Sequence, residues 1–230
     1  MAESGDPAAS RPALIRRFDS VEIALHWLYA GLFFVLLLSG LGLYLGPGQN
    51  PVLSHRSLVR EVHLDAALAL VALPVIVASA RVGTLSRLRR DVETFDRDDG
   101  RWLRRAFVPR FLRRKPLPPQ GRFNAGQKLN TIAVAAATVG FTVTGFLMWQ
   151  GAHLPTSLSE AADTWHLLLM VAMMPLIAGH LILALLLPST RPALRGVFVG
   201  TVRLDFARRR HAKWVAASEG ATTGEATPAH

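Results

Sequence analysis

The sequence contains no cysteine and has few acidic residues relative to basic ones. Without cysteine the chain cannot form disulfides, ligate an iron–sulfur cluster through thiolates or attach a c-type haem covalently. The 26 lysines and arginines outnumber the 16 aspartates and glutamates and give a net charge of +10. Because no basic groove with interleaved aromatic residues accompanies this charge, we expect no nucleic-acid partner.

Charged residues are also nearly absent from four long apolar segments. These segments cover about residues 21–45, 62–82, 129–150 and 164–187. Each approaches the roughly 20 apolar residues that cross a bilayer core, and in lipid such a segment must be helical to satisfy its own backbone. Aromatic residues typical of membrane interfaces lie near the segment ends, namely Trp27, Tyr44, Trp149 and Trp165. The sequence therefore predicts an all-α fold, an integral membrane four-helix bundle embedded in the lipid bilayer.

The distribution of lysine and arginine predicts how the bundle is oriented. The N-terminal tail has three, the first short loop two, the stretch from Arg81 to Lys128 fourteen, residues 151–163 none and the C-terminal segment seven. Loops rich in these residues stay in the cytoplasm. We therefore expect the N- and C-termini and the long loop to be cytoplasmic, in a multi-pass protein of the bacterial cytoplasmic (inner) membrane.

The segments outside the spans predict little further structure. Residues 1–17 and 215–230 have the composition of disordered tails, which leaves one domain over residues 18–214. No cleavable signal peptide is expected, because no small-residue cleavage motif follows the first apolar segment. The basic loop 83–128 is amphipathic and then Pro-rich, as expected of a membrane-surface helix with a linker, although a docking surface for a partner is an alternative.

Four of the eight histidines fall inside or at the ends of the apolar segments: His26, His63, His166 and His180. Ionisable residues in such places are rare and mark functional sites by default. Hydrogen bonding to a neighbouring helix would explain one such histidine but explains four poorly. The others, His55, His153, His211 and His230, lie in loops or the C-terminal segment, where we expect them to be solvated.

The depth of these four histidines predicts two pairs. Span one enters from the cytoplasm, so His26 lies near the inner side, whereas His63 and His166 begin spans that enter from outside. His180 follows His166 by fourteen residues, which places it roughly 21 Å deeper on the same helix face. His63 therefore faces His166 at the outer level, and His26 faces His180 at the inner level.

Two imidazoles facing each other across a helical bundle are what a six-coordinate haem iron requires. A zinc ion would need three or four ligands at one depth, and only two histidines occur at each level. We therefore predict two haem b groups, with the four histidines as ligands of the haem irons. Small residues, Gly40, Gly140, Gly145 and Gly179, could admit a macrocycle edge, although helix packing would use them equally well.

A polar motif, FNAGQKLN, precedes the third span at the cytoplasmic surface. Asn124 is a candidate helix N-cap, and Gly126 would let another group approach the backbone closely. The amides of Asn124 and Gln127 could hydrogen-bond a quinone carbonyl on the side of the inner haem. Helix capping, with Lys128 contacting lipid headgroups, is the alternative.

Three strings, ALHW around His26, FNAGQKLN and STRPALRG at residues 189–196, together with the histidine spacing, carry a family resemblance. Over about residues 16–214 the chain resembles the gamma subunit (cytochrome b556) of respiratory formate dehydrogenases, within a wider group of bacterial b561 and nickel–iron hydrogenase b-type cytochromes. The resemblance implies that His26 and His180 ligate the inner haem and that His63 and His166 ligate the outer one. It also implies a quinone site, with menaquinone as the expected quinone, formed by His180, Asn124, Gly126 and Gln127.

The same resemblance implies electron transfer from a periplasm-side iron–sulfur (beta) subunit and a catalytic dehydrogenase subunit to quinone. The chain has no other redox chemistry, so substrate oxidation is expected in those partners. A cytochrome b of a nickel–iron hydrogenase and a stand-alone b561-type quinol oxidase are alternatives. A histidine-lined metal transporter is a more remote one, because four spans without evident inverted repeats argue against it.

Overall fold

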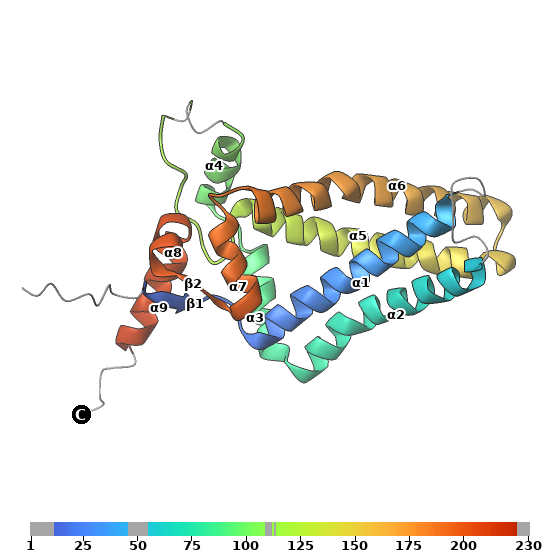
Figure 1. Cartoon of the computed structure of the whole chain (residues 1–230), viewed down its shortest axis with the longest axis horizontal. Coiled ribbons are helices and arrows are strands. Elements are labelled where there is room, and N and C mark those ends of the chain that lie inside the picture. Colours follow the sequence, from blue (N-terminus) through green and yellow to red (C-terminus); the bar gives the residue numbers. More distant parts are fainter. Residues whose placement is uncertain (1–11, 46–54, 109–111, 113, 225–230) are drawn as a thin grey trace, which may run out of the picture.

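The computed structural model describes residues 12–45, 55–108, 112 and 114–224, and its main feature is a bundle of four long helices (Figure 1). They are α1 (Ser20–Tyr44), α2 (Arg56–Ala80), α5 (Ala125–Trp149) and α6 (Thr156–Leu181), the last continuing as the wider π-helical turn η5 (Ile182–Leu186). All four are long and apolar enough to cross a membrane, which confirms the predicted bundle. Helices α2 and α6 begin earlier than their apolar segments because polar outer residues continue each helix beyond the hydrocarbon layer.

The bundle consists of two hairpins. Helix α1 packs along α2 and α5 packs along α6, whereas close backbone approaches between the two hairpins are sparse. One side-chain link between them is the hydrogen bond of the Tyr29 hydroxyl to the Thr138 hydroxyl. Large apolar side chains such as Leu38, Val139 and Leu186 are exposed on the outside of the bundle, as expected for helices that face lipid.

The long loop folds into two helices, α3 (Val82–Glu93) and α4 (Arg97–Ala106), against the cytoplasmic ends of the spans. Asp96 begins α4 through a capping box with Asp99. The Lys128 ammonium lies 2.8 Å from the Asp99 carboxylate and donates a hydrogen bond to the Thr94 carbonyl. Lys128 is therefore buried in an ion pair, and the alternative in which it contacts lipid headgroups is wrong in this respect.

The chain ends form a small cytoplasmic cap on the bundle (Figure 1). Strand β1 (Leu14–Arg16) pairs antiparallel with β2 (Thr201–Arg203). The turn η6 (Arg191–Ala193) and the short helix α7 (Leu194–Val199) connect the end of the fourth span to β2. Helices α8 (Leu204–Arg210) and α9 (Ala212–Gly224) follow β2 and complete the cap. The short turn η4 (Gly151–His153) is not part of the cap and joins α5 to α6 at the opposite end of the bundle. The cap has its own apolar core of Val202, Phe206, Ala207 and Val215.

The prediction of disordered tails is wrong wherever the structure describes them. Ile15 of β1 packs against the core of the cap, and helix α9 continues to Gly224 with Val215 buried. Residues 1–11 and 225–230, including His230, lie outside the described residues. Composition suggested disorder because each tail segment is too short to bury apolar surface alone, and only their pairing creates a core.

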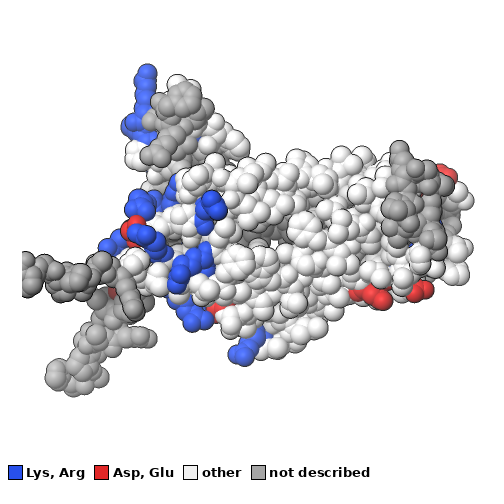
Figure 2. Space-filling model, in the orientation of Figure 1, with Lys and Arg blue, Asp and Glu red and all other residues white. Residues whose placement is uncertain are grey.

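Charge separates the two ends of the bundle. Lysine and arginine gather at the end that carries α3, α4 and the cap, where several of them pair with acidic side chains, and the opposite end shows more acidic than basic side chains on this face (Figure 2). Both β1 and α9 lie at the basic end, so the chain enters and leaves the bundle on one side. The bias of basic residues places this end in the cytoplasm.

Candidate haem sites and quinone motif

The four histidines in the spans form two facing pairs, one at each level of the bundle. The ring centres of His26 on α1 and His180 on α6 are 6.5 Å apart, with 51° between the ring planes. Those of His63 on α2 and His166 on α6 are 6.4 Å apart, with 61° between the planes. These are the pairs that depth along the spans predicts, and each pair links one hairpin to the other.

The separation within each pair fits an iron atom between the rings. A metal–imidazole bond is about 2 Å long, so two imidazoles on opposite sides of one iron have ring centres about 6.3 Å apart. Both pairs match this value. Among the residues that the structure describes, no three histidines or carboxylates converge as a bare metal site would require. The donor set therefore fits haem iron with two axial imidazoles at each level.

Hydroxyl groups hold the outer pair. The Nδ1 atom of His63 lies 2.8 Å from the Ser39 hydroxyl on α1, and Nδ1 of His166 lies 2.8 Å from the Thr144 hydroxyl on α5. Each contact leaves the Nε2 atom of its imidazole available as a ligand. Sequence analysis missed both residues, although each hydroxyl immediately precedes a glycine at the depth of the outer histidines.

The predicted glycines fall into distinct classes. A Cβ on Gly40 would lie 3.2 Å from Cε1 of His63, and one on Gly145 would lie 3.5 Å from Cε1 of His166. These two glycines therefore leave room for the imidazoles. Gly140 instead packs against Leu169 of α6, so it serves helix packing, and a Cβ on Gly179 would meet nothing within 4 Å.

The inner pair has a different environment. The ring centres of His26 and Trp27 are 5.3 Å apart, and the two rings are nearly perpendicular. The Trp27 indole donates a hydrogen bond of 2.8 Å to the Val197 carbonyl of α7. His180 follows Pro175, which removes one backbone donor from α6, and precedes the π-helical turn η5. Such turns often occur at functional sites. Within the described parts of the chain, neither inner imidazole makes a hydrogen bond to a side-chain hydroxyl.

The polar motif lies at the start of α5, where its side chains cap the helix. The side-chain oxygen of Asn124 accepts a hydrogen bond of 2.9 Å from the backbone N–H of Gln127. The side-chain oxygen of Gln127 accepts one of 3.0 Å from the backbone N–H of Asn124. Gly126 faces the Trp102 indole of α4, which a Cβ would approach to 3.2 Å. The capping alternative is therefore realised. In the described part of the chain, the side-chain NH2 groups of Asn124 and Gln127 make no hydrogen bond, so both remain available as donors.

Buried charges surround this motif. The Arg17 guanidinium donates to the Arg122 carbonyl at 2.6 Å and to the Gln127 side chain at 3.2 Å. Burial, together with the nearby positive charge of Arg122, lowers the pKa of Arg17 to about 9. Arg122 pairs with Glu22, one helical turn before His26, and lies 3.4 Å from Asp91. The motif is thus fixed to α1 and α3 by charge pairs between distant parts of the sequence.

A second buried cytoplasmic group, His211, was expected to be solvated and is not. It is 2% exposed, and its Nδ1 donates a hydrogen bond of 2.8 Å to the Gly121 carbonyl. Burial first, and then the positive charge of Arg17, lower the pKa of His211 to about 3. His211 is therefore neutral at physiological pH and joins the cap to the segment that leads into α5.

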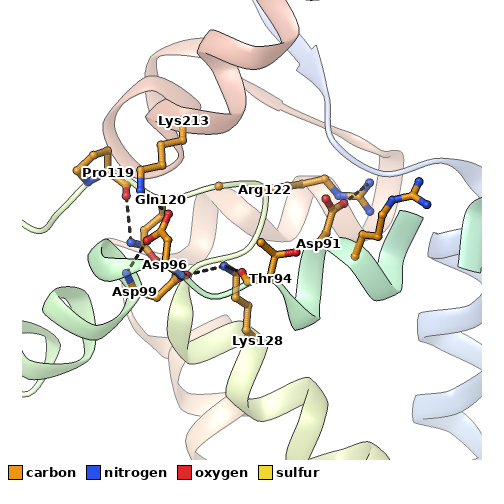
Figure 3. Close-up of a pocket in the computed structure, with 11 residues that line it drawn as sticks. Asp91, Thr94, Asp96, Asp99, Pro119, Gln120, Arg122, Lys128 and Lys213 are labelled. Carbon is orange, nitrogen blue, oxygen red and sulfur yellow. Dashed lines mark hydrogen bonds and ion pairs between the residues drawn. The ribbon is translucent and has the colours of Figure 1, made fainter. Parts of the chain in front are cut away.

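A polar cavity of about 260 Å³ lies beside the motif, between α3, α4 and α9 (Figure 3). Gln120, Arg122 and Lys128 line its side nearest α5. Lys213 of α9 reaches over it and lies 2.6 Å from the carboxylates of both Asp96 and Asp98. The hydrogen bond from Lys213 is the main reason that the pKa of Asp96 is lowered. The cavity therefore borders Arg122 and Lys128, which lie on either side of Asn124 and Gln127 in the sequence.

Comparison with known protein families identifies the group to which this arrangement belongs. Residues 17–200 match the family described as prokaryotic cytochrome b561. The chain belongs to this family. The match includes all four spans, both histidine pairs and the polar motif, and it ends just before β2. A comparison with curated proteins gives no match.

Family membership and the four spans together establish what kind of protein this is. This b561-family chain is a multi-pass inner-membrane cytochrome of the b type, which binds haem b and takes part in electron transfer. The wider group implied by the sequence resemblance is therefore confirmed.

Proposed function

We propose that the chain is the membrane-anchoring dihaem cytochrome b subunit of a respiratory dehydrogenase and delivers electrons to quinone at the cytoplasmic side. The observation that carries this proposal is the presence of two histidine pairs, each with ring centres 6.4–6.5 Å apart, at two depths of one bundle. His63 and His166 would hold the outer haem b, and His26 and His180 the inner one. When bound, the two haems supply one-electron carriers across the bilayer.

The quinone part of the proposal rests on the two side-chain amides at the start of α5. The NH2 groups of Asn124 and Gln127 can donate to a quinone carbonyl oxygen, while Gly126 leaves room for Trp102 of α4 against the same turn. Helix α5 packs along α6, whose cytoplasmic end carries His180. Reduction of the quinone to quinol takes up two electrons and two protons. The polar cavity beside Gln120 and Arg122 offers those protons a route from the cytoplasm.

The electron donor is proposed from the sequence resemblance to formate dehydrogenase gamma subunits. A periplasm-side iron–sulfur subunit and a catalytic dehydrogenase subunit would supply electrons at the outer haem. The corresponding measurement is co-purification of those subunits, together with formate-dependent haem reduction in native membranes. Hydrogen-dependent reduction, or activity of the chain alone as a quinol oxidase, would assign it to another branch of its family.

Haem content tests the proposal most directly. We expect the purified chain to contain two haem b per polypeptide and to show dithionite-reduced absorption bands of six-coordinate haem. The check is a pyridine haemochrome measurement against quantitative amino-acid analysis. A preparation with one haem, or with bound metal and no porphyrin, would contradict the dihaem assignment.

The variant Asn124→Asp tests the quinone motif. Aspartate caps a helix as well as asparagine does, so α5 keeps its start, but the variant loses the NH2 donor and gains a negative charge. We expect both haems to remain and the kcat/KM for quinone reduction to fall by about tenfold, the worth of roughly one hydrogen bond. Gln150→Glu, at the opposite end of the same helix, makes the same amide-to-carboxylate change outside the motif and is the matched control. Unchanged quinone reduction in Asn124→Asp would remove Asn124 from the site.

A further inference from the structure

The outer pair of histidines is held by two equivalent pairs of neighbouring residues, one from each hairpin. Ser39-Gly40 on α1 faces His63 on α2, and Thr144-Gly145 on α5 faces His166 on α6. In each case the hydroxyl contacts Nδ1, and the glycine leaves space for the Cε1 side of the same ring. We call these four residues the imidazole cradle.

Each hydroxyl of the cradle also has a backbone carbonyl of its own helix within hydrogen-bond distance. The Ser39 hydroxyl donates to the Val35 carbonyl at 2.6 Å, and the Thr144 hydroxyl donates to the Gly140 carbonyl at 2.8 Å. Each hydroxyl has one proton, and when that proton is donated to the carbonyl the oxygen accepts from the histidine. In this arrangement both outer imidazoles carry their proton on Nδ1 and leave Nε2 unprotonated, which is also the tautomer that ligation of iron through Nε2 requires.

An Nδ1–H donated to an acceptor makes an imidazole a more basic ligand. A more basic axial ligand stabilises ferric over ferrous iron, so second-shell hydrogen bonds are one of the means by which a protein sets a haem potential. In the described part of the chain the inner pair, His26 and His180, has no hydroxyl acceptor, and His26 contacts Trp27 instead. The two levels therefore differ in the groups that surround their imidazoles.

We propose that the imidazole cradle lowers the reduction potential of the outer haem below that of the inner haem, and so directs electrons inward. Ser39 and Thr144 are positioning residues, because they act through His63 and His166. This inference rests on the proposed assignment of those histidines as haem ligands. The direction has a physical use, because an electron that moves from the outer to the inner side works against the membrane potential. A downhill step between the haems offsets part of that work.

The test is a redox titration of the purified, haem-loaded full-length chain, followed in the haem absorption bands. In Ser39→Ala and Thr144→Val the outer haem should become easier to reduce, with an additive effect in the double variant. Loss of one hydrogen bond corresponds to about a threefold to tenfold rise in its reduced-to-oxidised ratio at fixed ambient potential. Repeating the titration in the His180→Ala background isolates the outer haem, because only that haem should remain.

Matched controls separate this effect from general damage to the helices. Thr142→Val removes a hydroxyl from α5 that also bonds the preceding turn but contacts no histidine, and Ser79→Ala does the same in α2. Both should leave the titration unchanged, and Thr144→Ser, which keeps the hydroxyl, should behave like the original chain. If Ser39→Ala loses the outer haem, Ser39→Cys, a weaker acceptor of similar size, should show the same rise.

The outcomes distinguish failure of this inference from failure of the proposed function. If two haems are present and the potential of the outer one is unchanged or falls in the cradle variants, the inference is wrong and the dihaem assignment stands. The inference is also wrong if the original chain has its higher potential at the outer haem. Absence of a haem that depends on His63 and His166 would overturn the proposed function itself.

Discussion

Replacement of His180 by alanine is expected to remove the inner haem and abolish quinone reduction. The imidazole of His180 faces that of His26 across the bundle, with ring centres 6.5 Å apart, so the variant would leave the proposed inner haem with His26 as its one histidine ligand. The outer pair, His63 and His166, lies at another depth and should retain its haem. Pyridine haemochrome analysis should show the haem content fall from two to one per chain, and electron transfer from reduced outer haem to a quinone analogue should stop.

The appropriate control for this experiment is His153→Ala. His153 lies in η4 at the outer end and is exposed, so its removal should affect neither haem. His26→Ala should reproduce the result of His180→Ala, because the two imidazoles would share one iron. Two haems and normal quinone reduction in His180→Ala would show that the inner pair is not a haem site.

The arrangement of the histidines was predictable because membrane helices constrain geometry strongly. A spanning segment must be helical, its rise per residue is fixed, and the basic loops give its direction. The fourteen residues between His166 and His180 therefore translate directly into a depth and a shared face. The pairing with His63 and His26 follows from topology alone, and the structure places the four rings in those pairs.

The groups around the rings were harder to predict, because they depend on the rotation of each helix about its axis. Ser39 and Thr144 are short polar residues that commonly bond their own helix, and nothing in their spacing separates them from Thr142. Their distinguishing feature is the glycine that follows each one. That glycine matters only when the neighbouring helix presents a histidine at the same depth, because its missing side chain then leaves room for the imidazole ring.

The cytoplasmic side was the least predictable part, because its contacts join residues far apart in the sequence. Arg122 pairs with Glu22, and Ile15 packs beside Val202. Each partner looks like an ordinary charged or apolar residue in a short polar segment when it is considered alone. For the same reason His211 resembled a solvated histidine, although its burial beneath the cap makes it a neutral structural donor.

The Asp99→Ala variant should destabilise the attachment of α4 to the bundle by about 3–5 kcal/mol. The side chains of Asp99 and Lys128 are 3% and 8% exposed and lie 2.8 Å apart, so the variant leaves a buried ammonium without a counter-ion. It also breaks the capping box with Asp96. The exposed pair Arg89–Glu93 provides the control, because Glu93→Ala should cost only up to about 1 kcal/mol.

Hydrogen exchange of the α4 amides measures this loss, because it reports the free energy of local opening. The double variant Asp99→Ala/Lys128→Met should recover much of the stability, since it removes the unpaired charge that dominates the single variant. Helix α4 also places Trp102 against Gly126, so its opening should loosen the start of α5 and slow quinone reduction while both haems remain. If the α4 amides of Asp99→Ala are as well protected from hydrogen exchange as those of the wild-type protein, the ion pair does not hold this helix.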